Sequence, residues 1–291
     1  MGRLRIFHET RYVYERPVRF GPQRLIIRPR DSHGLRIVEA SLTLFPAGET
    51  RWSYDANGNC VCVYQPEGEA DSMRVASELL IDRYPAPLAP PRIEDPHTLT
   101  PIIYAAEDRF TLEPFIAPAT DDPEAILLRW LRELDGGRDE SALAFLLRLN
   151  RLIHEGFAYR AREEEGVQTP VETLLNRGGA CRDLAWLMVE SLRRLGYAAL
   201  FATGYIHSPG GEIRGSGATH AWCEVFLPDL GWLEFDPTNG LAESSDLIRV
   251  AATRTPAQAL PVSGAIIGDP GASRLHVSVD VRLADEVDAA A

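Results

Sequence analysis

Three residue types that together perform acyl transfer occur in order along the second half of the chain: a cysteine, a histidine and an aspartate. Cys181 follows two glycines at the start of a segment with helical periodicity, and a helix N-terminus stabilises a thiolate through its dipole and free N–H groups. His220 begins an apolar strand, and Asp236 ends the next one. A thiolate, an imidazole that moves its proton and a carboxylate that orients the imidazole make a cysteine-dependent acyl-transfer site.

Each of these residues has a simpler explanation when it is taken alone. A lone cysteine is more often a small buried hydrophobe. A histidine at a strand end is more often a surface or capping residue, and an aspartate before a turn favours the turn itself. The order of the three residues argues against three separate explanations, because antiparallel strands joined by a turn at 228–231 bring His220 beside Asp236.

The first third of the chain predicts an antiparallel β domain. From Leu4 to about Asp82, short alternating segments are separated by turn residues, and the run DANGN at 55–59 favours a tight hairpin turn. Six prolines between 84 and 101 block helix and central strand, which indicates a linker. We expect a β domain at 1–118, with this linker at about 84–101, and a catalytic core at 119–291.

The second half predicts a mixed unit of helices and strands. Apolar residues at helical spacing predict helices over 122–135, about 140–154 and from 169, and a largely buried helix from Cys181 to Gly196. Asp122 is the expected cap of the first of these helices and Thr169 that of the third. The predicted strands are 198–206, 221–227, 232–235 and 275–281. The expected fold class is therefore α+β.

Composition excludes several kinds of partner. The 291 residues hold 30 Lys and Arg against 42 Asp and Glu, a net charge of −12, which argues against nucleic acid. Apolar runs are too short for a membrane helix, and the N-terminus does not resemble a signal peptide. Four scattered cysteines support neither a disulfide framework nor a zinc site. We expect a cytoplasmic protein without a metal or cofactor.

The three segments around these residues resemble the core motifs of the transglutaminase-like superfamily. They are GGACRDLA at 178–185, THAWCEV at 219–225 and GWLEFDPTNG at 231–240. Within this superfamily, the chain is similar to bacterial members that carry an N-terminal β domain before a papain-like core, and the resemblance covers nearly the whole chain. The segment 252–261 departs from the family pattern. If this segment helps to form the substrate cleft, the substrate of this chain differs from that of close relatives.

The resemblance implies a role for each residue of the trio. Cys181 would be the nucleophile, His220 the general base and acid, and Asp236 the orienting carboxylate. The backbone N–H of Cys181 is the natural first oxyanion donor, and Tyr159 and Trp222 are candidates for a second oxyanion or substrate contact, with core packing as the alternative for both. An acid at the position of Asp183 either holds the loop or contacts substrate.

Two classes of function follow. The first is an enzyme that acts on a peptide or protein amide through a Cys-His-Asp triad, either by hydrolysis, which needs no second specific pocket, or by transfer of the acyl group to an amine. The second is a non-catalytic scaffold or binding module of the same fold, against which the intact trio argues. Sequence leaves the substrate, the oligomeric state and the role of the β domain open.

Overall fold

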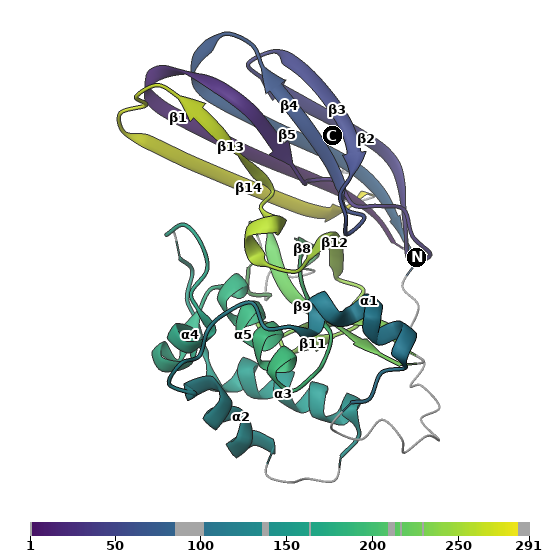
Figure 1. Cartoon of the computed structure of the whole chain (residues 1–291). Coiled ribbons are helices and arrows are strands. Elements are labelled where there is room, and N and C mark those ends of the chain that lie inside the picture. Colours follow the sequence, from purple (N-terminus) through teal and green to yellow (C-terminus); the bar gives the residue numbers. More distant parts are fainter. Residues whose placement is uncertain are drawn as a thin grey trace.

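The computed structural model describes residues 2–84, 102–135, 140–162, 164–208, 213–215, 217–228 and 230–284. A curled antiparallel sheet forms the upper part of Figure 1, and helices packed around a second sheet form the lower part. The α+β class predicted from the sequence is confirmed. The predicted linker at about 84–101 lies almost wholly outside the described residues.

The upper sheet is organised around one long strand, β1, which pairs along its length with four other strands. Its strands, within the described residues, are β1 (Gly2–Leu25), β2 (Leu35–Phe45), β3 (Gly48–Tyr54), β4 (Cys60–Pro66), β5 (Glu69–Arg83), β13 (Val262–Ile267) and β14 (Ser273–Leu283). The alternating segments of the first 82 residues therefore do form strands, and the expected turn at 55–59 joins β3 to β4.

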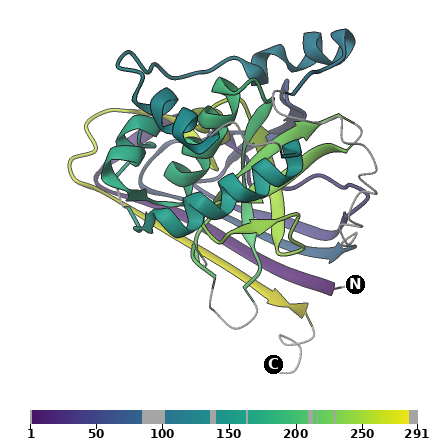
Figure 2. The same ribbon diagram turned by 90° about the horizontal axis from the view of Figure 1, so that it is seen from below.

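The last two strands differ from the expected division of the chain at residue 118. Residues 119–291 are expected to form the core, but β13 and β14 both pair with β1 and so belong to the upper sheet. Figure 2 shows yellow β14 running alongside purple β1. Local alternation predicts that a segment is a strand, but it carries no information about which distant strand is its neighbour.

The lower part holds five helices and two further sheets in the described residues. The helices are α1 (Ala106–Ile116), α2 (Ile126–Asp135), α3 (Ala142–Gly156), α4 (Pro170–Asn176) and α5 (Cys181–Arg194). The larger sheet has the order β11 (Leu241–Ala242), β10 (Gly231–Asp236), β9 (His220–Leu227), β8 (Ala199–Ile206) and β12 (Leu247–Thr253). β6 (Ala158–Tyr159) and β7 (Gly178–Gly179) form a short parallel pair, and a 3₁₀ helix spans Pro256–Ala259. Across the described residues, no helix is long and apolar enough to span a membrane.

Of the two caps predicted from the sequence, Thr169 begins its helix and Asp122 does not. Thr169 caps α4 together with Glu172, as a Thr-Pro start predicts. Ser141 caps α3. Asp122 does not begin a helix directly; its carboxylate accepts hydrogen bonds from the N–H groups of Ile126 and Leu128 instead, so α2 starts four residues later than expected.

One apolar core joins the two parts of the molecule. Helix α5 is buried on nearly all sides and packs against β9 and β8. Residues of β1 such as Leu4 and Ile6 belong to the same cluster as Leu184 and Leu187 of α5. Because burial of apolar surface is the main stabilising contribution, the upper sheet and the helical part are expected to unfold together.

A pair of facing glutamates gives the lower sheet a pH dependence. Glu234 of β10 lies opposite Glu224 of β9, and burial, then the charges of Glu224 and Glu243, raise the pKa of Glu234 to about 8. The folded state therefore holds a proton that the unfolded chain releases near its ordinary pKa of 4.5. Stability is full below that value and falls as pH rises towards 8.

We expect Glu234→Gln to stabilise the protein increasingly as pH rises from about 5 to about 8, because a neutral amide needs no proton in the folded state. Urea unfolding of both proteins across this pH range measures the difference. Glu155→Gln, at an exposed site on α3, is the control and should leave the pH profile unchanged. A constant offset between Glu234→Gln and wild type would contradict the prediction.

Candidate active site

Cys181 is the first residue of α5 and is held there by a tightly packed turn. The preceding glycines form β7 beside β6. A Cβ atom on Gly178 would lie 2.4 Å from the carbonyl oxygen of Ala158, and one on Gly179 would lie 2.6 Å from the Cβ of Asp183. Both positions therefore require glycine. The side chain of Cys181 is almost buried, and its N–H belongs to the first turn, which has no acceptor within the helix.

The carboxylate of Asp183 holds this turn in place. Its carboxylate accepts hydrogen bonds from the N–H of Ala180 at 2.8 Å, the N–H of Gln168 at 2.8 Å and the guanidinium of Arg162 at 2.8 Å. It is fully buried. Of the two roles left open by the sequence, this geometry supports the one in which Asp183 holds the loop that carries Cys181.

His220 and Asp236 lie side by side, as the hairpin geometry predicts. His220 begins β9 and Asp236 ends β10, and the Nε2 atom of His220 is 2.8 Å from an Oδ atom of Asp236. Both side chains are buried. The other ring nitrogen, Nδ1, is buried without a conventional hydrogen bond among the described residues, and it is the atom left to exchange a proton with a thiol.

Electrostatics favour a charged imidazole at this position. Burial by itself lowers the pKa of His220, but the charge of Asp236, its hydrogen bond, and the hydrogen bond and charge of Cys181 outweigh it and raise the pKa to about 10. Cys181 therefore lies within interaction distance of the ring. An imidazolium beside a thiol favours the thiolate, the nucleophilic form.

Asn239 belongs to the segment GWLEFDPTNG but is not among the site residues predicted from the sequence. Its side-chain N–H group donates to Asp236 at 2.8 Å, and the N–H of Thr238 donates to the same carboxylate at 2.9 Å. Burial would raise the pKa of Asp236, but the charge of His220 and these hydrogen bonds lower it. The sequence Asp-Pro-Thr-Asn is the signal for this arrangement. In a turn that follows an aspartate, the N–H groups of the turn residues point back towards the aspartate carboxylate.

Asn239 also holds a loop over His220. Its Oδ1 accepts the N–H of Arg214 at 2.9 Å, and its amide donates to the carbonyl of Arg214 at 3.2 Å. The next residue, Gly215, has φ +87°, and a Cβ there would lie 2.7 Å from Nδ1 of His220. The chain thus approaches the reactive nitrogen as closely as glycine allows.

We expect Gly215→Ala to reduce the alkylation rate of Cys181 at neutral pH about tenfold or more. The added methyl group would lie too close to Nδ1 of His220, so the ring or the loop must move, at a cost of roughly 1 to 3 kcal/mol. Alkylation by iodoacetamide, located by peptide mass spectrometry, measures the change. Gly217→Ala is a matched control, since Gly217 has φ +85° with nothing within 4 Å of its Cβ position. Equal losses in the two variants would show that backbone strain alone is responsible.

The two aromatic candidates lie in different surroundings. Tyr159 is partly exposed in β6; burial and the charge of Cys181 raise its pKa, which places it near Cys181. Trp222 is fully buried behind His220, with ring centroids 6.2 Å apart, in a cluster with Ile206 and Leu247. The burial of Trp222 supports the packing alternative for that residue, whereas Tyr159 is partly exposed and its role stays a prediction.

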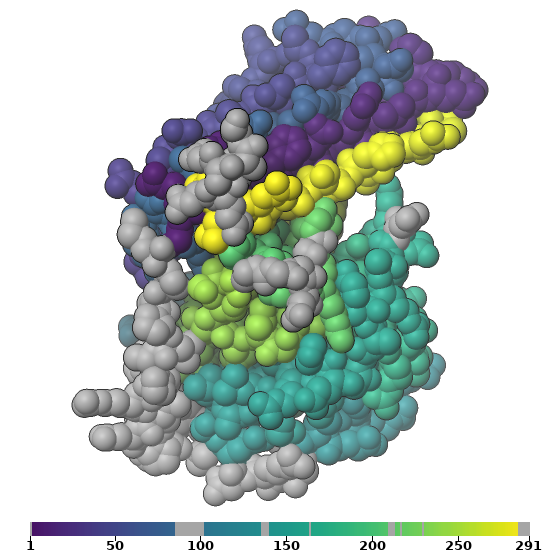
Figure 3. Space-filling view, turned by 180° about the vertical axis from the view of Figure 1, so that it is seen from behind, coloured from purple at the N-terminus to yellow at the C-terminus, as the bar shows by residue number. Residues whose placement is uncertain are grey.

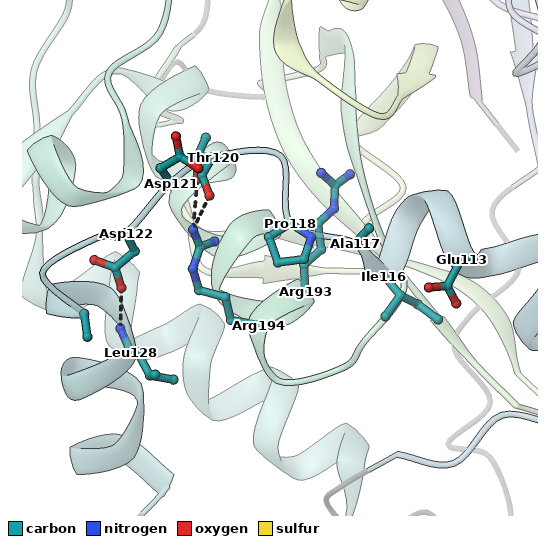
Figure 4. Close-up of a pocket in the computed structure, with 11 residues that line it drawn as sticks. Glu113, Ile116, Ala117, Pro118, Thr120, Asp121, Asp122, Leu128, Arg193 and Arg194 are labelled. Carbon is teal, nitrogen blue, oxygen red and sulfur yellow. Dashed lines mark hydrogen bonds between the residues drawn. The ribbon is translucent and has the colours of Figure 1, made fainter.

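A cavity of about 670 Å³ lies elsewhere in the described part of the molecule. Figure 4 shows that Arg193 and Arg194, at the C-terminal end of α5, line it. Since Cys181 is at the opposite end of this 14-residue helix, about 20 Å away, the cavity is not part of the site. Both arginines pair with Glu190, so they are structural.

The described residues contain no group of three side chains suited to a metal ion.

Family models match both parts of the chain. Residues 4–82 match the bacterial transglutaminase-like N-terminal region, and residues 129–237 match the transglutaminase-like superfamily. The second match includes Cys181, His220 and Asp236. The two models together therefore cover the upper sheet as far as β5 and the candidate site.

Similar proteins extend the likeness over the whole chain. An uncharacterized protein of Mycobacterium tuberculosis is 31% identical, over 96% of this chain and 92% of its own. A protein-glutamine gamma-glutamyltransferase of Pseudomonas aeruginosa is 35% identical over 32% of this chain and 15% of its own. A solved Cytophaga hutchinsonii structure, provisionally identified as a cysteine protease, has the same fold, with a TM-score of 0.72 and 19% identity over 96% of this chain and 90% of that one. These similarities support a thiol-dependent enzyme activity in general. The chain belongs to the transglutaminase-like superfamily.

Proposed function

We propose that the protein is a cysteine-dependent acyl-transfer enzyme acting on a peptide or protein amide. Cys181 is the nucleophile, His220 the base and acid, and Asp236 the orienting carboxylate. The observation that supports this most directly is the buried contact between Nε2 of His220 and Asp236 at 2.8 Å, which leaves Nδ1 for a cysteine at a helix N-terminus.

The proposed reaction has two stages. Sγ of Cys181 attacks the amide carbonyl while its proton resides on Nδ1 of His220, and the oxyanion is met by the N–H of Cys181. His220 then returns the proton to the nitrogen of the leaving amine as the C–N bond breaks, which forms a thioester. Water, deprotonated by the same ring, attacks the thioester, releases the acid and restores the thiol.

Hydrolysis is the proposed second stage. Water needs no second specific pocket, whereas an amine acceptor does. Mass spectrometry of products formed with and without added primary amine separates the two, because hydrolysis adds water and transfer adds the amine. Amine-containing products as the main outcome would replace hydrolysis by transglutaminase-type transfer.

Iodoacetamide alkylation as a function of pH tests the proposal without a known substrate. We expect Cys181 to react faster than Cys60 and Cys223, and to react well at pH about 6, where free thiols are mostly protonated. His220→Ala removes the base, so its Cys181 should need alkaline pH. Slow labelling of Cys181 in both proteins would favour the non-catalytic scaffold instead.

A further inference from the structure

The strand β14 lies at an edge of the upper sheet, directly beside the candidate site. It pairs with β1 on one side, and no strand pairs with its other side among the described residues. On that outer side the N–H of Val279 donates to the carbonyl of Gly217 at 3.0 Å. Because backbone groups alternate along a strand, those of Val277 and Leu275 point to the same outer edge.

The exposed side chains of this strand are apolar on the side that faces the helical part. Val279 is buried in the core shared by both parts. Residues two and four positions before it share its face, and these are Val277, 42% exposed, and Leu275, 51% exposed. The other face of β14 carries Arg274, Asp280 and Arg282, charges of the kind that protect an open edge. On the face towards the helical part, Val277 and Leu275 leave the edge apolar.

Two loops from the candidate site reach the upper sheet on either side of this stretch. One is the loop that covers His220 and contacts Val279 through Gly217. The other holds Glu165 and is bound by Arg182, the residue after Cys181, whose guanidinium donates to the carbonyls of Gly166 and Glu164.

The second loop lies within electrostatic reach of Tyr12. Burial and then the charge of Glu165 raise the pKa of Tyr12, and Tyr12 pairs with Leu275. The interval from Val279 to Leu275, about 14 Å of strand, therefore lies between the two loops that lead to His220 and Cys181. Figure 3 shows an opening beneath yellow β14, between the green and teal atoms.

We propose that β14 is the substrate-docking edge of this enzyme and that the acyl donor is an extended peptide segment, which pairs with the outer edge of β14 at Val277 and Leu275; the inference rests on the proposed acyl-transfer function. Backbone hydrogen bonds to an open edge give a peptide affinity, and alternate side chains give it selectivity. Apolar residues of the peptide pack beside Val277 and Leu275.

Charge favours a peptide over other occupants. Glu164 and Glu165 are exposed at the Tyr12 end of the opening, and the chain has a net charge of −12, so a polyanion is repelled and a neutral or basic peptide is not. The edge also contacts the loop over His220, through Val279 and Gly217. A docking surface unrelated to catalysis would not need to lie beside that loop. A second copy of this chain is the remaining occupant, and its pairing would appear as a dimer.

Protection of Cys181 from alkylation tests this docking. The probe is a randomised library of capped decapeptides, with the same library N-methylated at alternate residues as a second probe. For each variant, the alkylation rate with peptide is divided by its rate without peptide. Val277→Pro removes one N–H that points to the outer edge and leaves the hydrogen bonds to β1 in place. If that variant fails to fold, a double variant with Leu275→Ala and Val277→Ala replaces it. Ser278→Ala, whose side chain lies on the other face, is the matched control.

We expect the library to slow alkylation of the wild type. The half-protective concentration should rise about fivefold or more for Val277→Pro and for the N-methylated library, the effect of about one lost hydrogen bond. Ser278→Ala should match the wild type. Equal protection of wild type and Val277→Pro, no protection at all, or an edge filled by a dimer in gel filtration overturns the docking proposal. These outcomes differ from failure of the proposed function, in which Cys181 is not rapidly alkylated even without peptide.

Discussion

Asp236→Asn is expected to reduce the rate of acyl-enzyme formation by about three orders of magnitude while the protein remains folded. The carboxylate accepts the Nε2–H of His220 and so fixes which ring nitrogen faces Cys181. An amide at this position can present its NH₂ group instead, which favours the other tautomer, and such a change costs a related triad about 10⁴ in kcat. It also removes the charge that contributes to the raised pKa of His220.

Single-turnover measurement with an activated acyl probe, followed by intact-protein mass spectrometry, gives this rate. The imidazole pKa of His220, followed by NMR, should fall in the variant from its value near 10. Asp71→Asn is the control, since Asp71 is exposed on β5 and should affect neither quantity. An Asp236→Asn protein that keeps its rate within a factor of ten would exclude the orienting role.

The candidate trio could be singled out from the sequence because each member lies beside a strong local signal. Two glycines precede Cys181, a short turn joins the strands of His220 and Asp236, and these signals fix geometry over a few residues. The hairpin prediction is confirmed by the pairing of β9 with β10. The nearness of Cys181 to the pair, by contrast, depends on how α5 packs against β9, and for this the family resemblance was needed.

Contacts between distant segments could not be predicted in the same way. The pairing of β14 with β1 joins residues more than 250 positions apart, such as Arg5 and Arg282, and nothing in the alternation of either segment identifies the other. Gly215 is similar, because its role depends on the ring of His220 rather than on its own neighbours. Long-range packing determines both, and it leaves no local pattern.

Asp183→Asn is expected to destabilise the protein by about 3 to 5 kcal/mol, the cost of leaving one member of a buried ion pair without its partner. Arg162, 19% exposed at its side chain, loses its carboxylate, and the N–H groups of Ala180 and Gln168 lose a charged acceptor. Since these groups hold the turn before Cys181, alkylation of Cys181 should also slow. Urea unfolding monitored by tryptophan fluorescence measures the change in stability.

Two further variants separate the ion pair from the loss of a carboxylate as such. Glu172→Gln changes the exposed acid of a capping box and should cost about 1 kcal/mol or less. Arg162→Met combined with Asp183→Asn removes both charges, so the double variant should be less destabilised than the sum of the two single ones. If the losses simply add, Asp183 acts through its bonds to the backbone alone. If Asp183→Asn instead keeps full stability and loses only peptide turnover, the carboxylate contacts substrate, and the structural role argued from its burial is wrong.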